Sequence, residues 1–417
     1  MPTRDPAPTL RRHFFFVAGF DPMDAEGHHR IFHREMARFA SVWNVEVEAQ
    51  DAPRPTPTGA LWDATAHGAG WTTQARVELL CWDDLVRAEM GRSRGSHVLG
   101  GIRAILDMIA TGTIVRYFRF SHRYGIFFLL TYVALLAILG VSAGAGWLAH
   151  HLAAGLGALP AIGIGLAAAV ACFLGAMATF GARMRLKQSL DLAEFSVDFV
   201  RRRHPAIDAR MDAFAERLLA VVDEGGVDGG GVDEIVIAGH SLGAMHAVSL
   251  LARALEKDPD FPRRATVRLL TVGNTSAKFA LHPAGGWLRA AGEKVFEARD
   301  IYWAEFQARD DLVSFYKVNP VTLRHAGNSN GLLRPFVRQV TIREMMTPAT
   351  FRRYRLDLMR LHCQFFLAND RRAAYDFYAF IFAPVSFDAV VHEIQGPLEI
   401  LDPDGAIIPL EHRGSAA

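Results

Sequence analysis

The sequence has little cysteine. Its 417 residues include three, Cys81, Cys172 and Cys363, which stand far apart and form no Cys-x-x-Cys pair or Cys/His metal spacing. This scarcity argues against a disulfide framework or a zinc site, and it fits a reducing compartment. We expect the three cysteines to be small buried residues without a chemical role.

An excess of charge is missing as well. Lys and Arg total 45 and Asp and Glu total 44, so the composition gives no reason to expect a nucleic acid as partner. What the chain has in quantity is apolar side chains, at 51% of its residues, and enough length for one large domain or two ordinary ones. An ordered protein with a substantial core is expected.

From Tyr124 to Ala182 the sequence contains no Asp, Glu, Lys or Arg. A bilayer core about 30 Å thick needs about 20 apolar residues per helix, and two such lengths fit here, Ile126–Leu148 and Leu159–Ala182. We therefore predict a transmembrane helical hairpin over residues 124–182. The alternative is a buried helical pair in a soluble protein, although soluble core helices usually carry a charged edge.

Basic residues flank this stretch on both sides, whereas the loop between the two predicted helices has no Lys or Arg. By the positive-inside rule, both long flanks are expected in the cytoplasm, on a multi-pass protein of the cell inner membrane. Small residues are predicted to let the two helix backbones approach, namely Gly140 with Gly144 and Gly163 with Gly165. The flanking basic residues are Arg116, Arg119 and Arg123 on one side and Arg183, Arg185 and Lys187 on the other.

Outside the hairpin, short apolar runs typical of strands alternate with segments of helical spacing, which favours a parallel sheet. The proline-rich segment 51–60 is predicted to be a loop. The predicted strands are 13–19, 42–49, 76–82, 234–239, 266–274 and 300–308, and helices are predicted over 23–39, through 211–222 and over 241–255.

Neither of the two segments that flank the hairpin has enough predicted strands to form a stable sheet by itself. We therefore predict a single α/β domain, a doubly wound and mostly parallel sheet, interrupted by the hairpin. Its two parts are residues 1–123 and residues 183–400, and residues 401–417 form a C-terminal tail.

The segment EIVIAGHSLGAMHAVSL joins a predicted strand to a predicted helix. At the junction stands Gly-x-Ser-x-Gly, with His240 and Leu242 on either side of Ser241. A serine on such a sharp turn has strained backbone angles, and Gly239 and Gly243 remove the side chains that would collide there. The pattern predicts a nucleophile elbow, with the Leu242 amide facing an oxyanion at the start of the helix.

In this segment the chain resembles the α/β-hydrolase superfamily, and the motif GHSLGA is similar to that of its class 3 lipase-like branch. The resemblance is specific over 234–250 and looser from there to about Phe380, and the hairpin is not part of the usual pattern. It implies a serine hydrolase in which nucleophile, acid and histidine follow in this order along the chain. It implies no metal and no organic cofactor.

For the acid, the resemblance points to the segment after the strand 300–308. Asp311 is preferred because Asp311-Leu312-Val313 is similar to the Asp-x-Val wording of lipases, and Asp310 is the alternative. Both could also be turn or capping residues.

For the histidine, His362 is preferred because aromatic residues follow it as in the His-x-x-aromatic wording of the family. His392 is the second choice and is expected in a strand. His325 is predicted to lie in an exposed turn, and His412 lies in the expected tail.

The second oxyanion amide is expected from the loop after the first strand, in FFFVAGFDP. Phe20 is preferred and Asp21 is the alternative, although this loop lacks the HGGG run of many lipases. Three histidines follow in the predicted helix 23–39 without a matching set of carboxylates. We expect these residues, His28, His29 and His33, on the surface and not in a metal site.

Together these features predict a membrane-anchored serine hydrolase that cleaves a carboxylic ester, of a lipid or another acyl compound, through an acyl-Ser241 intermediate. The expected partners are the lipid bilayer and an ester or acyl substrate. Two alternatives stay open: a non-catalytic membrane adaptor on a hydrolase scaffold, and an acyltransferase or thioesterase that uses the same triad.

Overall fold

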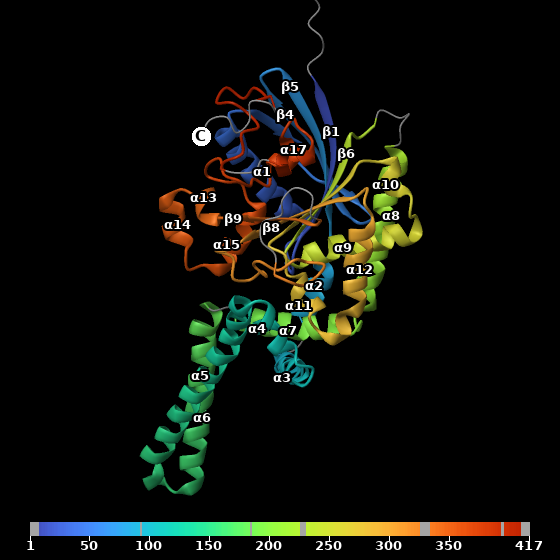
Figure 1. Cartoon of the computed structure of the whole chain (residues 1–417). Coiled ribbons are helices and arrows are strands. Elements are labelled where there is room, and N and C mark those ends of the chain that lie inside the picture. The colour runs from blue at the N-terminus through green and yellow to red at the C-terminus, as the bar shows by residue number, and fades with distance from the viewer. Residues whose placement is uncertain are drawn as a thin grey trace, which may run out of the picture. The chain divides into compact units, whose positions relative to one another are not determined.

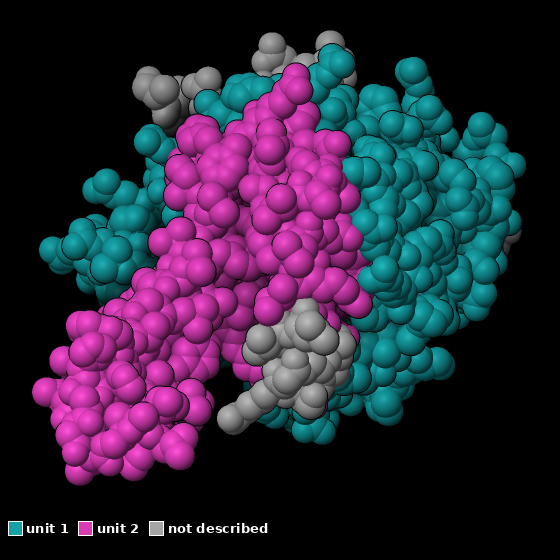
Figure 2. Space-filling model, turned by 90° about the horizontal axis from the view of Figure 1, so that it is seen from below, with its two compact units in different colours: residues 1–88, 200–417 teal, residues 89–199 magenta. Residues whose placement is uncertain are grey.

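The computed structural model describes residues 8–91, 94–183, 186–225, 231–325, 334–392 and 396–409. The chain divides into two compact units (Figure 2). Residues 1–88 and 200–417 form one of them, the sheet unit, and residues 89–199 form the other, the helical unit.

The sheet unit contains a nine-stranded, mostly parallel sheet (Figure 1). Its strand order is β2-β4-β5-β1-β6-β7-β8-β9, with β3 paired to β4 at one side. The strands are β1 (Thr9–Val17), β2 (Glu46–Ala49), β3 (Arg54–Thr56), β4 (Gly59–Gly68), β5 (Trp71–Leu80), β6 (Glu234–His240), β7 (Val267–Val272), β8 (Tyr302–Ala308) and β9 (Phe336–Val340).

The strand β1 lies in the middle of the sheet and pairs in parallel with β5 and with β6. The register brings Val17, the last residue of β1, opposite Gly239 near the end of β6. Parallel strands end at the same edge, so the segments that follow β1 and β6 meet there. The two parts of the chain that flank the helical unit therefore contribute strands to one sheet.

The N-terminal edge of the sheet is antiparallel, because β4 runs opposite to β5, β2 and β3. The prediction of a loop over the proline-rich residues 51–60 is therefore wrong: β3 lies there, and β4 begins there. Proline is tolerated in an edge strand, where its missing N–H disrupts no central ladder, and Pro55 occupies such a position, opposite Ala60.

Helices cover both faces of the sheet (Figure 1). Phe14 and Phe16 of β1 pack in one core with α1 and the C-terminal helices. His13 lies on the opposite face of the strand, where it and Arg217 of α8 both bind the Glu78 carboxylate. The helices of this unit are α1 (Ala25–Trp43), α2 (Asp83–Met90), α8 (Pro205–Glu224), α9 (Leu242–Lys257), α10 (Phe261–Arg264), α11 (Ser276–Ala280), α12 (Gly286–Glu297), α13 (Ile342–Met345), α14 (Pro348–Tyr354), α15 (Leu358–Cys363), α16 (Ala379–Phe382) and α17 (Phe387–His392).

The helical unit contains two long apolar helices, which pack against each other and are joined by the short turn η1 (Ala154–Leu156). Both are long and apolar enough to cross a membrane. Their outer surfaces are apolar as well, with Leu136 exposed by 67% and Leu159 by 83%. The helices of this unit are α3 (Arg94–Ala110), α4 (Thr113–Phe120), α5 (His122–Leu152), α6 (Ala158–Ala176), which continues through the π-helical turn Met177–Gly181, and α7 (Leu186–Val200).

The close approach of α5 and α6 occurs at Gly146 and Gly165. A Cβ atom at Gly146 would lie 2.7 Å from the Gly165 carbonyl oxygen, and one at Gly165 would lie 2.9 Å from the Gly146 carbonyl oxygen. The predicted contacts at Gly140, Gly144 and Gly163 are wrong, since a Cβ at each of them would meet no atom within 4 Å. Glycine is common in such helices, and only the pair that faces the partner helix is part of the packing.

Candidate active site

Ser241 stands on the turn between β6 and α9, at the edge where the parallel strands end. Its φ of 57° and ψ of −121° lie in a region that side-chain-bearing residues rarely occupy, so the turn is strained. The backbone is held on both sides, because the Ser241 amide donates to the Val272 carbonyl at 3.0 Å and its carbonyl accepts from the Thr275 amide at 3.4 Å. The side chain is half-buried.

The two glycines of the motif are required by contacts with different elements. A Cβ at Gly239 would lie 2.5 Å from the Ala244 Cα in the first turn of α9. One at Gly243 would lie 2.0 Å from the Val17 carbonyl oxygen at the end of β1. The sequence predicts small residues at both positions. The structure adds that the missing side chain of Gly243 lets the end of β1, and not β6, approach the start of α9.

Asp311 and His362 form a buried hydrogen-bonded pair. Asp311 follows β8 and His362 lies in α15, and both are 1% exposed. The His362 Nδ1 and the Asp311 Oδ2 are 2.8 Å apart, and the Val313 amide donates to the other carboxylate oxygen at 2.9 Å. Burial alone would raise the pKa of Asp311, but the charge of His362 and these hydrogen bonds bring that pKa below its usual value.

This pairing fixes the tautomer of His362. A carboxylate accepts hydrogen bonds, so in the neutral form of the ring the Nδ1 carries the proton and the Nε2 carries a lone pair. The Nε2 is buried and has no hydrogen-bond partner among the described residues, which means that no bond to the Ser241 hydroxyl is formed in this structure. An imidazole whose Nε2 is unprotonated and has no hydrogen-bond partner can accept a proton from a nearby hydroxyl.

Two residues next to the serine turn contact His362. The His240 Nε2 donates to the His362 carbonyl at 3.1 Å, and the two rings are 4.6 Å apart. Gly273 follows Val272, which binds the Ser241 amide, and a Cβ there would lie 3.1 Å from the His362 Cε1. The serine turn and the imidazole are therefore held in one neighbourhood. Burial, together with the neighbouring His362, lowers the pKa of His240 to about 3, so His240 stays neutral.

The loop after β1 lies against Ser241. A Cβ at Gly19 would be 3.0 Å from the Ser241 Cβ and 3.5 Å from its hydroxyl oxygen. The Asp21 amide donates to the Gly19 carbonyl at 2.8 Å, so the amide of Asp21, the alternative candidate, is engaged within the loop. Phe20, the preferred candidate, lies between these two residues. The other candidate amide is that of Leu242, the first residue of α9, and the first amides of a helix have no partner within the helix.

The alternative residues lie elsewhere. Asp310 caps a turn, accepting from the Arg343 amide at 3.4 Å. His392 is exposed and lies 3.5 Å from the hydroxyl of Tyr302, at the start of β8, whereas Asp311 follows the other end of this strand, roughly 20 Å away. His392 also ends the helix α17, so the strand prediction for it is wrong.

The two other histidines that follow Asp311 in the chain are His325 and His412. His325 is exposed, and its backbone forms a bridge with Val318. His412 lies outside the described residues.

The early histidines are not the surface residues that the sequence predicts. His28 is 8% exposed and His29 is 4% exposed, in the buried face of α1. Burial lowers the pKa of both. His29 and His33 share the Gln50 carbonyl at 3.0 and 2.9 Å, and within the described part of the chain no three His, Cys, Asp or Glu side chains are grouped to hold a metal.

Glu305 is a buried carboxylate that the sequence analysis does not single out. It lies in β8 and is 1% exposed, and it accepts hydrogen bonds from Asn274 at 3.0 Å and Gln307 at 3.2 Å and also from Thr271. Asn274 in turn accepts from the Phe315 amide through its carbonyl at 3.5 Å. Glu305 thus ties the loop after β7 to the segment that follows Asp311. An acidic residue within an apolar strand is the signal that could have revealed it.

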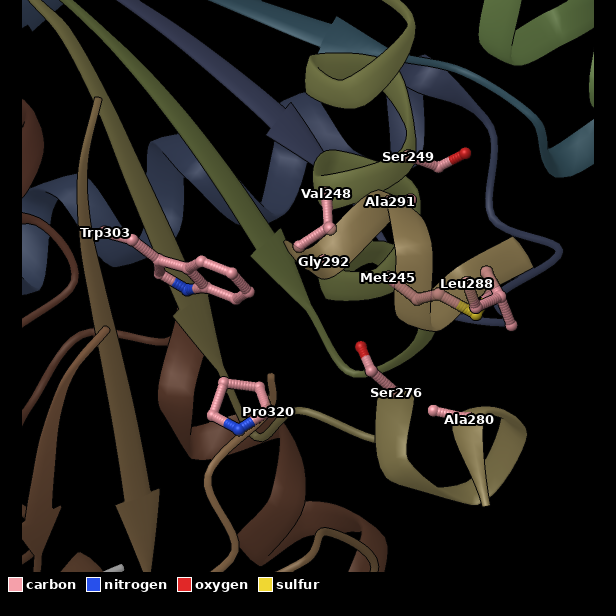
Figure 3. A pocket seen from close by; sticks show the side chains of 10 residues that line it. All are labelled: Met245, Val248, Ser249, Ser276, Ala280, Leu288, Ala291, Gly292, Trp303 and Pro320. Atoms are coloured by element: carbon pink, nitrogen blue, oxygen red, sulfur yellow. The ribbon is translucent and has the colours of Figure 1, made fainter. Parts of the chain in front are cut away.

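A small cavity lies between α9, α11, α12 and the start of β8 (Figure 3). Met245, Val248, Leu288 and Trp303 line it together with Ser276, and none of the three catalytic candidates does. Its volume of about 20 Å³ accommodates a single water molecule. This cavity therefore cannot hold an acyl chain in the structure as it stands.

Comparisons of the chain with protein-family models, with curated proteins and with solved structures find no match.

Proposed function

We propose that this protein is a serine hydrolase of the α/β-hydrolase type, anchored by a transmembrane hairpin of α5 and α6, that cleaves carboxylic esters. The observation that supports the proposal is the buried pair of His362 and Asp311, 2.8 Å apart at Nδ1 and Oδ2. The His362 Nε2 has no hydrogen-bond partner among the described residues, and Ser241 is held on a strained turn.

In the proposed reaction, His362 takes the proton of the Ser241 hydroxyl as its oxygen attacks the ester carbonyl. The Leu242 and Phe20 amides stabilise the oxyanion, and His362 returns the proton to the leaving alcohol. Water then repeats these steps on the acyl-Ser241, which releases the acid. Asp311 stabilises the imidazolium that forms in each step. The hairpin makes a lipid or another membrane-held acyl compound the substrate class we favour.

A fluorophosphonate probe tests the nucleophile directly. We expect the full-length wild-type chain in detergent to be labelled and Ser241→Ala to remain unlabelled. Ser276→Ala is the matched control, because Ser276 is another half-buried serine. Its hydroxyl has no hydrogen-bond partner among the described residues, so its removal should leave labelling intact. A folded wild-type protein that does not react would overturn the proposal in favour of a non-catalytic membrane adaptor.

A further inference from the structure

The helix α3 of the helical unit has apolar side chains on two faces. Ala104 and Met108 face inward and are 1% exposed each, and the Tyr117 hydroxyl of α4 lies 4.0 Å from the Met108 sulfur. Ile102, Leu106 and Ile109 face outward and are exposed by 51%, 59% and 59%. Their spacing of four and three residues forms one stripe, which we call the α3 stripe. A surface helix in water would carry polar residues there.

The rotation of α3 about its own axis is fixed by its contacts with α7. Arg103 binds both carboxylate oxygens of Asp198, at 2.6 and 2.7 Å. Gly100 lies directly against Glu194, since a Cβ there would be 1.9 Å from the Glu194 carboxyl carbon. Both contacts come from the Arg103 Nη2, and this charge-assisted pair and the close packing at Gly100 oppose rotation of the helix. The α3 stripe therefore cannot turn into the helical unit to hide its apolar surface.

The α3 stripe lies at the end of the helical unit where α5 begins. α3, α4 and α7 gather there, and the α5–α6 pair extends beyond them (Figure 1). The ring of Tyr117 packs on Tyr124 and Phe128 of α5, at 5.2 and 5.4 Å between centroids. Tyr117 of α4 therefore connects Met108 of α3 to the start of α5 through buried contacts, and Arg119 of α4 is exposed.

We propose that α3 lies in the interface of the same bilayer that α5 and α6 cross, with Ile102, Leu106 and Ile109 inserted at the boundary of headgroups and acyl chains. An amphipathic helix buries its apolar face there, and basic residues beside it attract anionic headgroups. This proposal depends on the transmembrane part of the proposed function. Its consequence is that the helical unit is held at one depth at the membrane surface, and not only tethered to it.

Spin labels on single cysteines test the depth of α3. Cys81, Cys172 and Cys363 are replaced by alanine in the full chain, and one cysteine is introduced at 102, 106 or 109. Leu136→Cys on the exposed surface of α5 is the control for lipid, and Glu297→Cys on the exposed surface of α12 is the control for water. Each labelled protein is placed in vesicles of phosphatidylcholine and phosphatidylglycerol, and collisions with oxygen and with a water-soluble nickel complex are measured.

We expect the three α3 labels to collide with oxygen more and with nickel less than the label at position 297. Nickel access at all three, with position 136 in lipid, would overturn the interfacial helix and leave the transmembrane pair intact. Shielding from both reagents would also overturn it, because it would show a protein contact such as a second copy. Nickel access at position 136 as well would overturn the transmembrane proposal itself.

Discussion

The orientation of the His362 ring decides which nitrogen faces the serine. The Asp311 Oδ2 lies 2.8 Å from the Nδ1, so the Nε2 is the proposed base. An asparagine at 311 can donate its own N–H toward Nδ1 and favours the opposite tautomer, in which Nε2 is protonated and cannot accept. The proposed reaction is therefore expected to depend strongly on Asp311, although Asp311 does not itself react.

We expect Asp311→Asn to lower the hydrolysis rate of a p-nitrophenyl ester by roughly 10⁴-fold, the scale of this substitution in a serine protease triad. The melting temperature should show that the protein still folds. Asp310→Asn is the matched control and should behave as wild type, since Asp310 only accepts from the Arg343 amide. A large loss in the control with little loss in Asp311→Asn would assign the acid to Asp310 instead.

The residue types of the candidate site can be predicted from the sequence, because the proposed serine hydrolase reaction requires a serine, a histidine and an acid. A serine between glycines, an aspartate after a strand and a histidine before aromatic residues are local patterns that point to Ser241, Asp311 and His362. The support around them is not local. His240 meets the His362 carbonyl across 122 positions of the chain, and Glu305 meets Asn274 across 31 positions. Nothing near these residues in the sequence specifies such contacts.

Glu305 gives the sheet unit a dependence on pH. Burial raises the pKa of Glu305 to about 7 from an ordinary 4.5, although the hydrogen bonds from Thr271, Asn274 and Gln307 act in the opposite direction. A carboxyl with a higher pKa in the folded chain stabilises the fold when it is protonated. This contribution is complete below the ordinary pKa, and it is lost as the pH rises through about 7.

We therefore expect the melting temperature of wild type to fall by several degrees between about pH 5 and about pH 8, and that of Glu305→Gln to fall less. Glutamine carries no charge and keeps an oxygen for Thr271 and Asn274. Glu297→Gln, at an exposed position of α12, controls for the loss of one carboxylate. Equal slopes for wild type and Glu305→Gln would show that Glu305 is not the group that titrates.

At the scale of elements, the contact between α5 and α6 depends on one pair of glycines. We expect Gly146→Leu to separate the two helices and to cost about 1–3 kcal/mol, because its Cβ would lie 2.7 Å from the Gly165 carbonyl oxygen. Gly140→Leu makes the same gain in helix propensity at a position with open space. The amount of SDS that unfolds the helices, followed by circular dichroism, should fall for the first variant only. A fall of equal size in both would contradict this packing.

The elements that the sequence predicts well are those with strong apolar patterns. β6, β7 and β8 are runs of mostly buried residues. The two long apolar helices are predicted because residues 124–182 contain no charged residue. The strand β4 is missed because its inward residues are mostly alanine, with Ala60, Ala64 and Ala66 buried beside Trp62, and alanine gives little alternation in hydrophobicity. The helix α17 is too short for its period to be told from that of a strand.

At the scale of the whole molecule, the helical unit is an insertion between two parts of one sheet. Because β1 pairs with β6, the chain must leave the sheet unit and come back to it. If α5 and α6 both cross the bilayer, the two parts of the sheet unit necessarily lie on the same side. Only the turn between the helices, at Ala154–Leu156, reaches the other side.

This arrangement can be tested in bacterial cells that express the full chain without its native cysteines. A cysteine at Leu156, which is 65% exposed in the turn, should react with a membrane-impermeant maleimide applied from outside once the outer membrane is opened. A cysteine at Glu297 should react only after lysis, because basic residues that flank both helices favour the cytoplasm for the sheet unit. The reverse pattern would invert the orientation. Equal reactivity before lysis, or none at either site until lysis, would mean that the pair does not cross the membrane.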